Sequence, residues 1–206
     1  MNSTTLLDIA MNHSEKIIID ARQGDKKAFN KLVGLWYKRI YNFSYKYFND
    51  HDLATETTQR TFISVFNNLS RLQDLGKFKP WLYKIALNFC RDEERKTHNR
   101  LKVVVNDSSQ EDSARDIEDT ESAGPDQLYM QNQVSELVLN SIEKLNEEQK
   151  EVLIMKEYEG LKFREIAEII GVSENTVKSR LYYGFANLKK ILEKERVFKE
   201  SVNYGI

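Results

Sequence analysis

The 206-residue chain has little cysteine, proline, glycine and histidine, and each scarcity excludes a class of protein. A single cysteine, Cys90, cannot form an internal disulfide, so the chain does not fit a disulfide-stapled secreted scaffold. No run of 18 apolar residues occurs, which predicts no membrane insertion. Residues 1–13 lack the basic start and continuous apolar stretch of a secretory signal. We therefore expect a cytoplasmic protein.

Catalytic constellations are missing as well. His13, His51 and His98 lie far apart in the sequence, and there is no HExxH pair, glycine-rich phosphate loop or second cysteine. Cys90 fits helix packing better than nucleophilic chemistry. These residues build no metal site and no activated nucleophile, so we expect no cofactor and no enzymatic activity.

The net charge of −1 hides a strong segregation of charge along the chain. Residues 1–105 carry 18 Lys and Arg against 11 Asp and Glu, whereas residues 106–127 carry one Arg against eight acids. Residues 128–206 are nearly balanced, with 12 against 13. A basic first part favours a polyanion partner, although charge counts alone fit a solvated surface equally well.

The pattern of apolar residues predicts an all-α protein, because spacings of three and four dominate and few strand-like alternations occur. Residues 106–127 contain one large apolar residue, Ile117, and cannot bury enough surface to become ordered. We therefore predict two small helical domains, residues 14–100 and 128–195, joined by a flexible acidic linker, residues 101–127. The expected helices cover about residues 14–23, 25–47, 52–69, 80–98, 128–144, 146–160, 164–170 and 174–195.

Several residues mark the expected helix ends. Pro80 suits a first helical turn, where its missing N–H is not needed. Gly160 and Gly171 are expected in the left-handed conformation at helix C-termini. The expected N-caps are Asp25, Asp52, Asn146 and Ser173.

Residues 163–181 have the form of a helix-turn-helix. Small Ala167 lets the two helices approach, and Gly171 makes the tight turn. The core between the helices is expected to consist of Ile166, Ile170, Val172, Val177 and Leu181. A plain helical hairpin is the alternative, but it does not require the turn glycine, the small residue and the core spacing to coincide.

The last helix is amphipathic at 100° per residue, with Val177, Leu181, Gly184 and Leu188 on one side. Its outward face offers amide, ammonium, hydroxyl and phenol groups near the N-terminal end, where a recognition helix meets base edges and phosphates. The residues expected to contact DNA there are Asn175, Lys178, Ser179, Arg180, Tyr182 and Tyr183.

A second candidate DNA surface lies on the helix that contains Pro80. Lys84, Asn88, Arg91 and Arg95 form a stripe at helical spacing, with Trp81 at its edge. Cations beside an aromatic ring suit a nucleic-acid backbone with a stacking residue nearby. The preceding loop adds Leu72 and Lys77 as candidate contacts. The pattern leaves open that Trp81 and Phe89 belong to the core and that the cations are merely solvated.

These segments resemble the extracytoplasmic-function group of sigma-70 factors. The motifs GDKKAF (residues 24–29), QRTF (59–62) and WLYKIALN (81–88) are similar to region 2 of that group. Residues 145–192 are similar to its region 4. Both motifs occur in family order with a variable segment between them, which makes the pair more specific than either half.

The resemblance implies an alternative sigma factor with two partners, core RNA polymerase and promoter DNA. Region 2 would bind the clamp helices of the largest subunit, through residues that include Glu56, Gln59, Arg60 and Phe62. It would also melt the −10 element, with bases captured in the loop of about residues 68–76 and with Asn88 near the point of strand separation. Region 4 would place its recognition helix at the −35 element and touch the flap of the second-largest subunit. Whether an anti-sigma factor binds as well stays open.

The chain departs from the family pattern at two places. Arg60 replaces an acid on the polymerase-binding helix. Tyr182-Tyr183-Gly184-Phe185 stands where the family often has His-Arg-Ala-Arg, so two phosphate-seeking cations are lost. An unusual −35 sequence or affinity is expected from the second change. A response regulator, which also ends in a helix-turn-helix, would need an α/β receiver, and residues 1–105 show no strand pattern.

Overall fold

The computed structural model describes residues 15–105 and 136–203, with side chains described at 15–97 and 136–195. Throughout these ranges the chain is helical and contains no strand, which confirms the all-α prediction. The predicted linker residues 106–127 and the start of the helix expected at 128–144 lie outside the described ranges. None of the described helices combines the length and apolar character needed to cross a bilayer.

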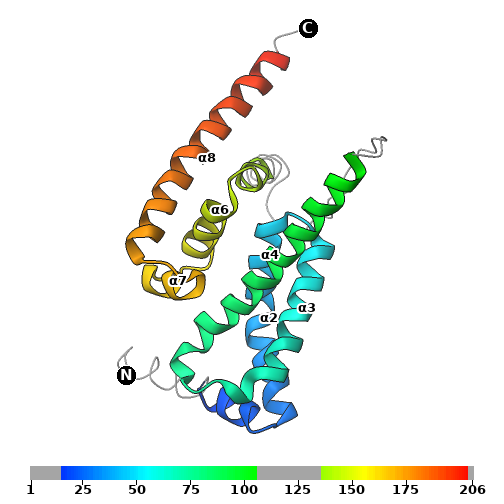
Figure 1. Cartoon of the computed structure of the whole chain (residues 1–206), viewed down its shortest axis with the longest axis vertical. Coiled ribbons are helices and arrows are strands. Elements are labelled where there is room, and N and C mark those ends of the chain that lie inside the picture. Colours follow the sequence, from blue (N-terminus) through cyan, green and yellow to red (C-terminus); the bar gives the residue numbers. More distant parts are fainter. Residues whose placement is uncertain (1–14, 106–135, 204–206) are drawn as a thin grey trace, which may run out of the picture.

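The helices form two groups (Figure 1). The first contains a helix over residues 15–22, α2 (Lys26–Phe48), α3 (His51–Asn68) and α4 (Phe78–Val105), with the short 3₁₀ turns η1 (Leu69–Arg71) and η2 (Leu75–Lys77) before α4. The second contains a helix over residues 136–143, α6 (Glu147–Leu153), the π-helical turn η3 (Ile154–Tyr158), α7 (Phe163–Ile170) and α8 (Glu174–Asn203).

Most predicted caps are confirmed, and one is wrong. The Asp25 carboxylate accepts hydrogen bonds from the N–H groups of Lys27 and Ala28 at 2.7 and 3.2 Å. Asp52 does not cap α3, because Asp50 accepts the Leu53 N–H at 2.9 Å. Asn146 and Ser173 cap α6 and α8 through the N–H groups of Gln149 and Thr176. Gly160 and Gly171 adopt the predicted left-handed conformation, with φ of 61° and 74°.

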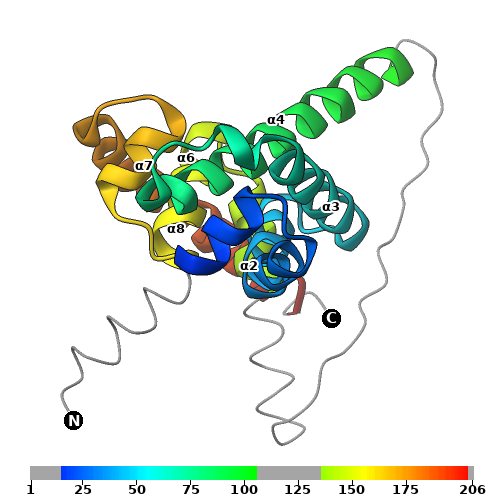
Figure 2. The same cartoon turned by 90° about the horizontal axis from the view of Figure 1, so that it is seen from below.

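Two helices are longer than the sequence pattern predicts. Helix α4 begins two residues before Pro80 and continues to Val105, so residues 101–105, expected in the linker, are helical. Figure 2 shows the C-terminal end of α4 extending away from the other helices. Helix α8 continues to Asn203, eight residues beyond the expected end at 195.

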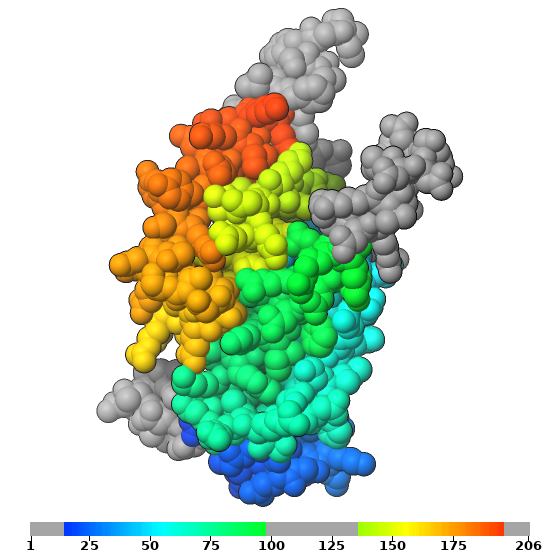
Figure 3. Space-filling model, viewed as in Figure 1, coloured from blue at the N-terminus to red at the C-terminus, as the bar shows by residue number. Residues whose placement is uncertain are grey.

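The buried apolar side chains of the two groups form one continuous cluster. In the first group it is centred on α2 and α4, where Phe43, Tyr83 and Cys90 are fully buried. In the second it contains Ile154 and Met155 of η3. Helix α7 contacts α4 and η3 contacts α2, and Figure 3 shows the two surfaces meeting along α4. The two groups are therefore docked against each other.

The core of the helix-turn-helix differs slightly from its prediction. Ile166, Val177 and Leu181 are buried as expected, whereas Ile170 and Val172 are only partly buried. Ile169 is buried in their place, because the turn at Gly171 directs this side of α7 toward the rest of the second group. Cys90 is fully buried, as its packing role requires, and burial raises the pKa of its thiol.

Candidate nucleic-acid interface

The outward face of α8 is open to solvent along its first three turns. Val177, Leu181, Gly184 and Leu188 all point inward, as the helical spacing predicts. A Cβ added at Gly184 would lie 3.4 Å from the Cβ of Gln149, so α8 approaches α6 closely at this point. The approach turns the opposite side of α8 away from the protein, where Asn175, Lys178, Ser179, Tyr182 and Tyr183 are exposed.

Two tyrosines dominate this exposed face of α8, the predicted recognition face. Tyr182 is 72% exposed and Tyr183 is 61% exposed, and their rings meet edge to face at 5.7 Å. The ammonium group of Lys178 lies 5.7 Å from the ring centroid of Phe163 on α7. Arg180, predicted to contact DNA here, instead donates a hydrogen bond to Glu148 of α6 at 2.5 Å. The face therefore presents one cation and two large phenols.

The predicted stripe on α4 is divided by the docking of the two helical groups. Lys84, Asn88 and Arg95 are exposed. Arg95 pairs with Asp92 on its own helix. Arg91 is half-buried, and its guanidinium group donates two hydrogen bonds to Glu151 of α6 at 2.5 and 2.7 Å. Of the four residues in the stripe, Arg91 is the one engaged by the second group.

A cavity of about 580 Å³ lies beside the irregular segment between α3 and α4. The carbonyl of Leu72 accepts a hydrogen bond from Arg22 at 3.1 Å, and Asp74 accepts the Gly76 N–H at 2.9 Å. The first bond ties the segment to the helix over residues 15–22, and the second closes a turn within the segment. The lining residues are Ser64, Asn68, Arg71, Leu72, Gln73, Asp74, Lys77, Trp81 and Ile85.

The three sequence-predicted residues at this cavity differ in exposure. Leu72 is buried, Trp81 is partly buried against the core, and Lys77 is exposed. The sequence left open whether Trp81 belongs to the core or to the DNA surface. The ring packs on the core and also lines the cavity. Phe89 is also partly buried, and the guanidinium carbon of Arg60 lies 4.7 Å from its ring centroid.

The candidate polymerase-binding residues lie on α3 in two environments. Glu56 and Gln59 are exposed, whereas Phe62 is buried and stacks on Tyr37 of α2 at 6.1 Å. Arg60 faces α4, with its guanidinium group 3.1 Å from the Glu93 carboxylate. The Lys96 ammonium and Arg60 guanidinium beside Glu93 lower the pKa of that carboxyl.

The sequence analysis missed three exposed apolar side chains on α2 and α3. Ile63 and Phe66 of α3 are 62% and 56% exposed, and Leu35 of α2 is 52% exposed. Phe66 makes an edge-to-face contact with Phe29 at 5.0 Å. Ile63 and Phe66 follow Gln59 on α3 by four and seven residues, and this helical spacing could have indicated that the three share a face.

Comparison with known proteins gives two family matches in the same order along the chain. Residues 32–100 match the sigma-70 region 2 family, and residues 135–188 match the sigma-70 region 4 family. The chain belongs to the sigma-70 family. It is an alternative sigma factor of the extracytoplasmic-function (ECF) group, which directs promoter recognition for transcription initiation.

Its relatives carry names of the same group. The ECF RNA polymerase sigma-E factor of Haemophilus influenzae is 26% identical over 172 residues, which cover 82% of this sigma factor and 89% of the relative. The ECF RNA polymerase sigma factor SigW of Bacillus subtilis is 27% identical over 194 residues, which cover 86% and 96%. Relatives of nearly the same length therefore align with both regions.

Two solved structures have a similar fold. The sigma factor RpoE of Bartonella quintana, in complex with the anti-sigma factor NepR, superposes with a TM-score of 0.64 at 20% identity, covering 81% of this chain and 98% of that one. CnrH, in complex with the cytosolic domain of CnrY, gives a TM-score of 0.62 at 20% identity, with coverage of 88% and 97%.

Proposed function

We propose that this sigma factor contacts promoter DNA at two separate surfaces while bound to core RNA polymerase. The observation that carries the proposal is the pairing of an open recognition face on α8 with a cavity next to α4, within regions 4 and 2 respectively. In this proposal region 2 spans residues 14–100 and region 4 spans residues 128–195. The factor contributes positioning and strand separation in the cytoplasm, and the polymerase supplies the catalysis.

The α8 face is proposed to read the −35 element. Asn175 and Ser179 supply hydrogen-bonding groups for base edges, and Lys178 supplies a cation for a phosphate or a guanine. Tyr182 and Tyr183 supply rings for thymine methyl groups and hydroxyls for phosphates. Arg180 acts indirectly, by fixing α8 on α6 through Glu148.

The α4 surface and the neighbouring cavity are proposed to act at the −10 element. Lys84 and Arg95 hold the backbone while the Asn88 amide lies at the fork between paired and unpaired DNA. A base that leaves the stack loses a few kcal/mol of stacking and pairing energy and needs a pocket that offsets this loss. The cavity lined by Leu72, Lys77 and Trp81 has room for such a base.

Protein partners are proposed from the family and from the named complexes. Glu56, Gln59 and the apolar residues Ile63 and Phe66 of α3 offer a surface for the clamp helices of the polymerase largest subunit. Region 4 is proposed to touch the flap of the second-largest subunit. Since RpoE and CnrH are described in complexes with NepR and with the cytosolic domain of CnrY, an anti-sigma protein is proposed for this chain too.

The central test is transcription with purified core polymerase on a library of promoter sequences. We expect run-off products that depend on this sigma factor, and sequencing of the templates will give the −35 and −10 elements. Co-purification with core polymerase should accompany this activity. Tight sequence-specific binding by the sigma factor alone, with no transcript, would favour a conventional repressor or activator instead.

The melting role of Asn88 is tested by Asn88→Ala. We expect normal polymerase binding but slower opening of duplex promoters, because the amide at the fork is lost. A promoter pre-melted by mismatches across the −10 region should restore activity, and permanganate footprinting will report the bubble. Asn67→Ala, the same change at an exposed position of α3 outside the cavity, is the matched control. Normal opening of duplex promoters by Asn88→Ala would disprove the fork role.

A further inference from the structure

Region 4 presents a row of glutamates to region 2. They come from three consecutive elements, α6, η3 with the residue after it, and α7, and each lies within reach of a basic or phenolic group of region 2. We call this row the acidic face of region 4. Its members are Glu147, Glu151, Glu159, Glu165 and Glu168.

The most buried carboxylate of this face belongs to an ion pair with Arg91, which is itself half-buried. Glu151 is fully buried, and both of its carboxylate oxygens accept hydrogen bonds from Arg91. Glu147 lies 3.7 Å from the same guanidinium group. A planar guanidinium binds carboxylate and phosphate in the same bidentate way, so Glu151 occupies the position that a DNA phosphate would take on Arg91.

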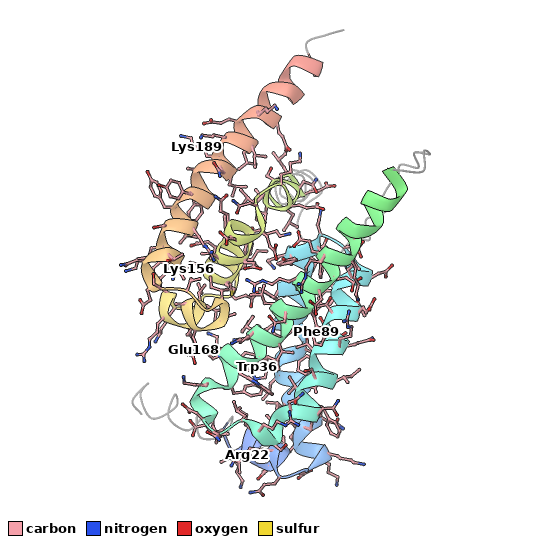
Figure 4. All side chains as sticks on the ribbon, viewed as in Figure 1. Arg22, Trp36, Phe89, Lys156, Glu168 and Lys189 are labelled. Carbon is pink, nitrogen blue, oxygen red and sulfur yellow. The ribbon has the colours of Figure 1, made fainter. Side chains whose placement is uncertain are left out.

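Two further glutamates engage the edge of the cavity. The Lys77 ammonium group, which lines the cavity, donates a hydrogen bond to Glu168 at 2.6 Å. Lys79 lies 3.6 Å from Glu165. Glu168 lies on α7 where this helix approaches the start of α4 (Figure 4). Region 4 therefore contacts both the −10 cavity and the α4 stripe in the same arrangement.

Contacts of the opposite polarity lock the two regions together. Lys150, adjacent to Glu151, is only 3% exposed, and its ammonium group donates a hydrogen bond to Glu94 of α4 at 2.7 Å. The same ammonium lies 4.1 Å from the ring centroid of Tyr47, whose hydroxyl also donates to Glu94. Lys150 of α6 thus pairs with an acid of region 2, and the adjacent Glu151 pairs with a cation of region 2. This alternation of charge fixes the register in which the two regions dock.

We infer that the acidic face of region 4 is a docking surface for the DNA-binding face of region 2, so that this sigma factor shields its own −10 surface until polymerase or promoter separates the regions. The inference rests on the proposed function, in which the cavity lined by Lys77 acts at the −10 element, and on the prediction from the sequence that Arg91 contacts DNA beside it. The partner of the face is the chain's own basic surface, and the face takes the place of the phosphates of −10 DNA.

The physical basis is competition for the same cations. Arg91 cannot bind Glu151 and a phosphate in the same bidentate geometry, so the docked form has a lower affinity for single-stranded DNA. The apparent dissociation constant rises in proportion to the reciprocal of the open fraction. Separation of the regions hydrates Glu151 and Arg91 together, whereas loss of one partner in the docked form leaves a buried charge uncompensated.

The test uses the full chain and single-stranded oligonucleotides of each strand of the −10 element found in the library experiment, and the strand that binds the wild type more tightly is the probe. Glu151→Gln removes the carboxylate, and Glu157→Gln makes the same change at an exposed residue of η3 outside the acidic face. We expect Glu151→Gln to increase the radius of gyration in X-ray scattering and to bind the oligonucleotide about tenfold more tightly or better. Glu157→Gln should match the wild type in both measurements, and circular dichroism will verify the folding of each variant.

A charge swap keeps the test independent of any single variant. Glu151→Arg should open the molecule, and Arg91→Glu with Glu151→Arg should restore the compact form in scattering, since opposite charges again face each other. An extended wild type, an unchanged radius for Glu151→Gln, or an expanded Glu151→Gln with unaltered DNA affinity would each overturn the inference. Failure of transcription by the wild type with core polymerase would instead disprove the proposed function.

Discussion

Side-chain chemistry on the proposed recognition face of α8 determines which base contacts that face can offer. Tyr183 is 61% exposed on α8, next to Tyr182, and Arg180 is held against α6. The accessible face therefore lacks the guanidinium group that most often reads guanine. Phenol rings and amides favour A·T pairs, through thymine methyl groups and adenine edges.

We expect Tyr183→Arg to shift the selected −35 element toward guanine. The new guanidinium can form a bidentate contact with guanine and adds one cation near the phosphates, so the salt dependence of promoter binding should become steeper by about one unit of slope. Promoter-library selection and a salt titration measure the two effects. Tyr183→Phe, which removes only the hydroxyl at the same position, separates the effect of the new guanidinium from the loss of the phenol. An unaltered −35 preference in Tyr183→Arg would exclude this position from base contact.

The exposure of single residues could be predicted from helical spacing, but their ion-pair partners could not. The spacing of 100° per residue correctly placed Asn175, Lys178 and Ser179 outward. It grouped Arg180 and Arg91 with DNA-facing residues, yet each is bound to a glutamate of α6, 32 and 60 residues away in sequence. Local periodicity gives the side of a helix, whereas the partner depends on tertiary packing.

At the scale of the helices, end signals were accurate where local chemistry alone decides them. Asp25, Asn146 and Ser173 cap their helices as predicted. Asp52 was wrong because α2 ends at Asn49, a residue in the left-handed conformation, and α3 begins directly after Asp50. Helix α4 is longer than expected because residues 98–105 contain no glycine or proline that would end it.

The corrected cap gives a prediction with an internal control. Asp50→Ala should lower the free energy of unfolding by about 0.5–2 kcal/mol, because the Leu53 N–H loses its acceptor. Asp52→Ala removes an acid from the first turn of α3 and should cost less, about 0.3–1 kcal/mol through the helix dipole. Urea denaturation followed by circular dichroism measures both. A larger loss for Asp52→Ala than for Asp50→Ala would contradict the observed cap.

At the scale of the whole molecule, the charge pattern indicated a polyanion partner for the basic first part of the chain. It did not reveal that region 4 supplies an acidic face itself, since residues 128–206 are nearly neutral overall. The face exists only after folding, which brings Glu151 of α6, Glu159 directly after η3 and Glu168 of α7 to one side. Net charge counts residues, whereas a docking surface depends on where they lie.

Docking of the two regions should depend on pH through Glu159. Burial raises the pKa of this carboxyl above its ordinary value of 4.5, although the Tyr83 hydroxyl and the nearby cations Lys46, Arg39 and Lys79 lower it. The closed form therefore binds a proton more readily than the open form. The resulting stabilisation is complete below pH 4.5 and is lost as the pH rises through the raised pKa.

We expect acidification from pH 7.5 toward pH 4.5 to increase the compact fraction in X-ray scattering. Glu159→Gln should weaken this pH dependence, and Glu157→Gln should leave it intact. Expansion of the wild type on acidification would show that the ion pairs outweigh the burial of the carboxylates.

The docked arrangement also has a consequence for how strong its contacts need to be. The 30 residues between 105 and 136 can span at most roughly 110 Å, so region 4 always remains within that distance of region 2. A single copy confined to such a sphere has an effective concentration of roughly 0.3 mM or more. Docking with an intrinsic dissociation constant several-fold below roughly 0.3 mM would therefore suffice to keep most molecules closed, and dilution would not open them. Polymerase and promoter then need only a modest preference for the open form.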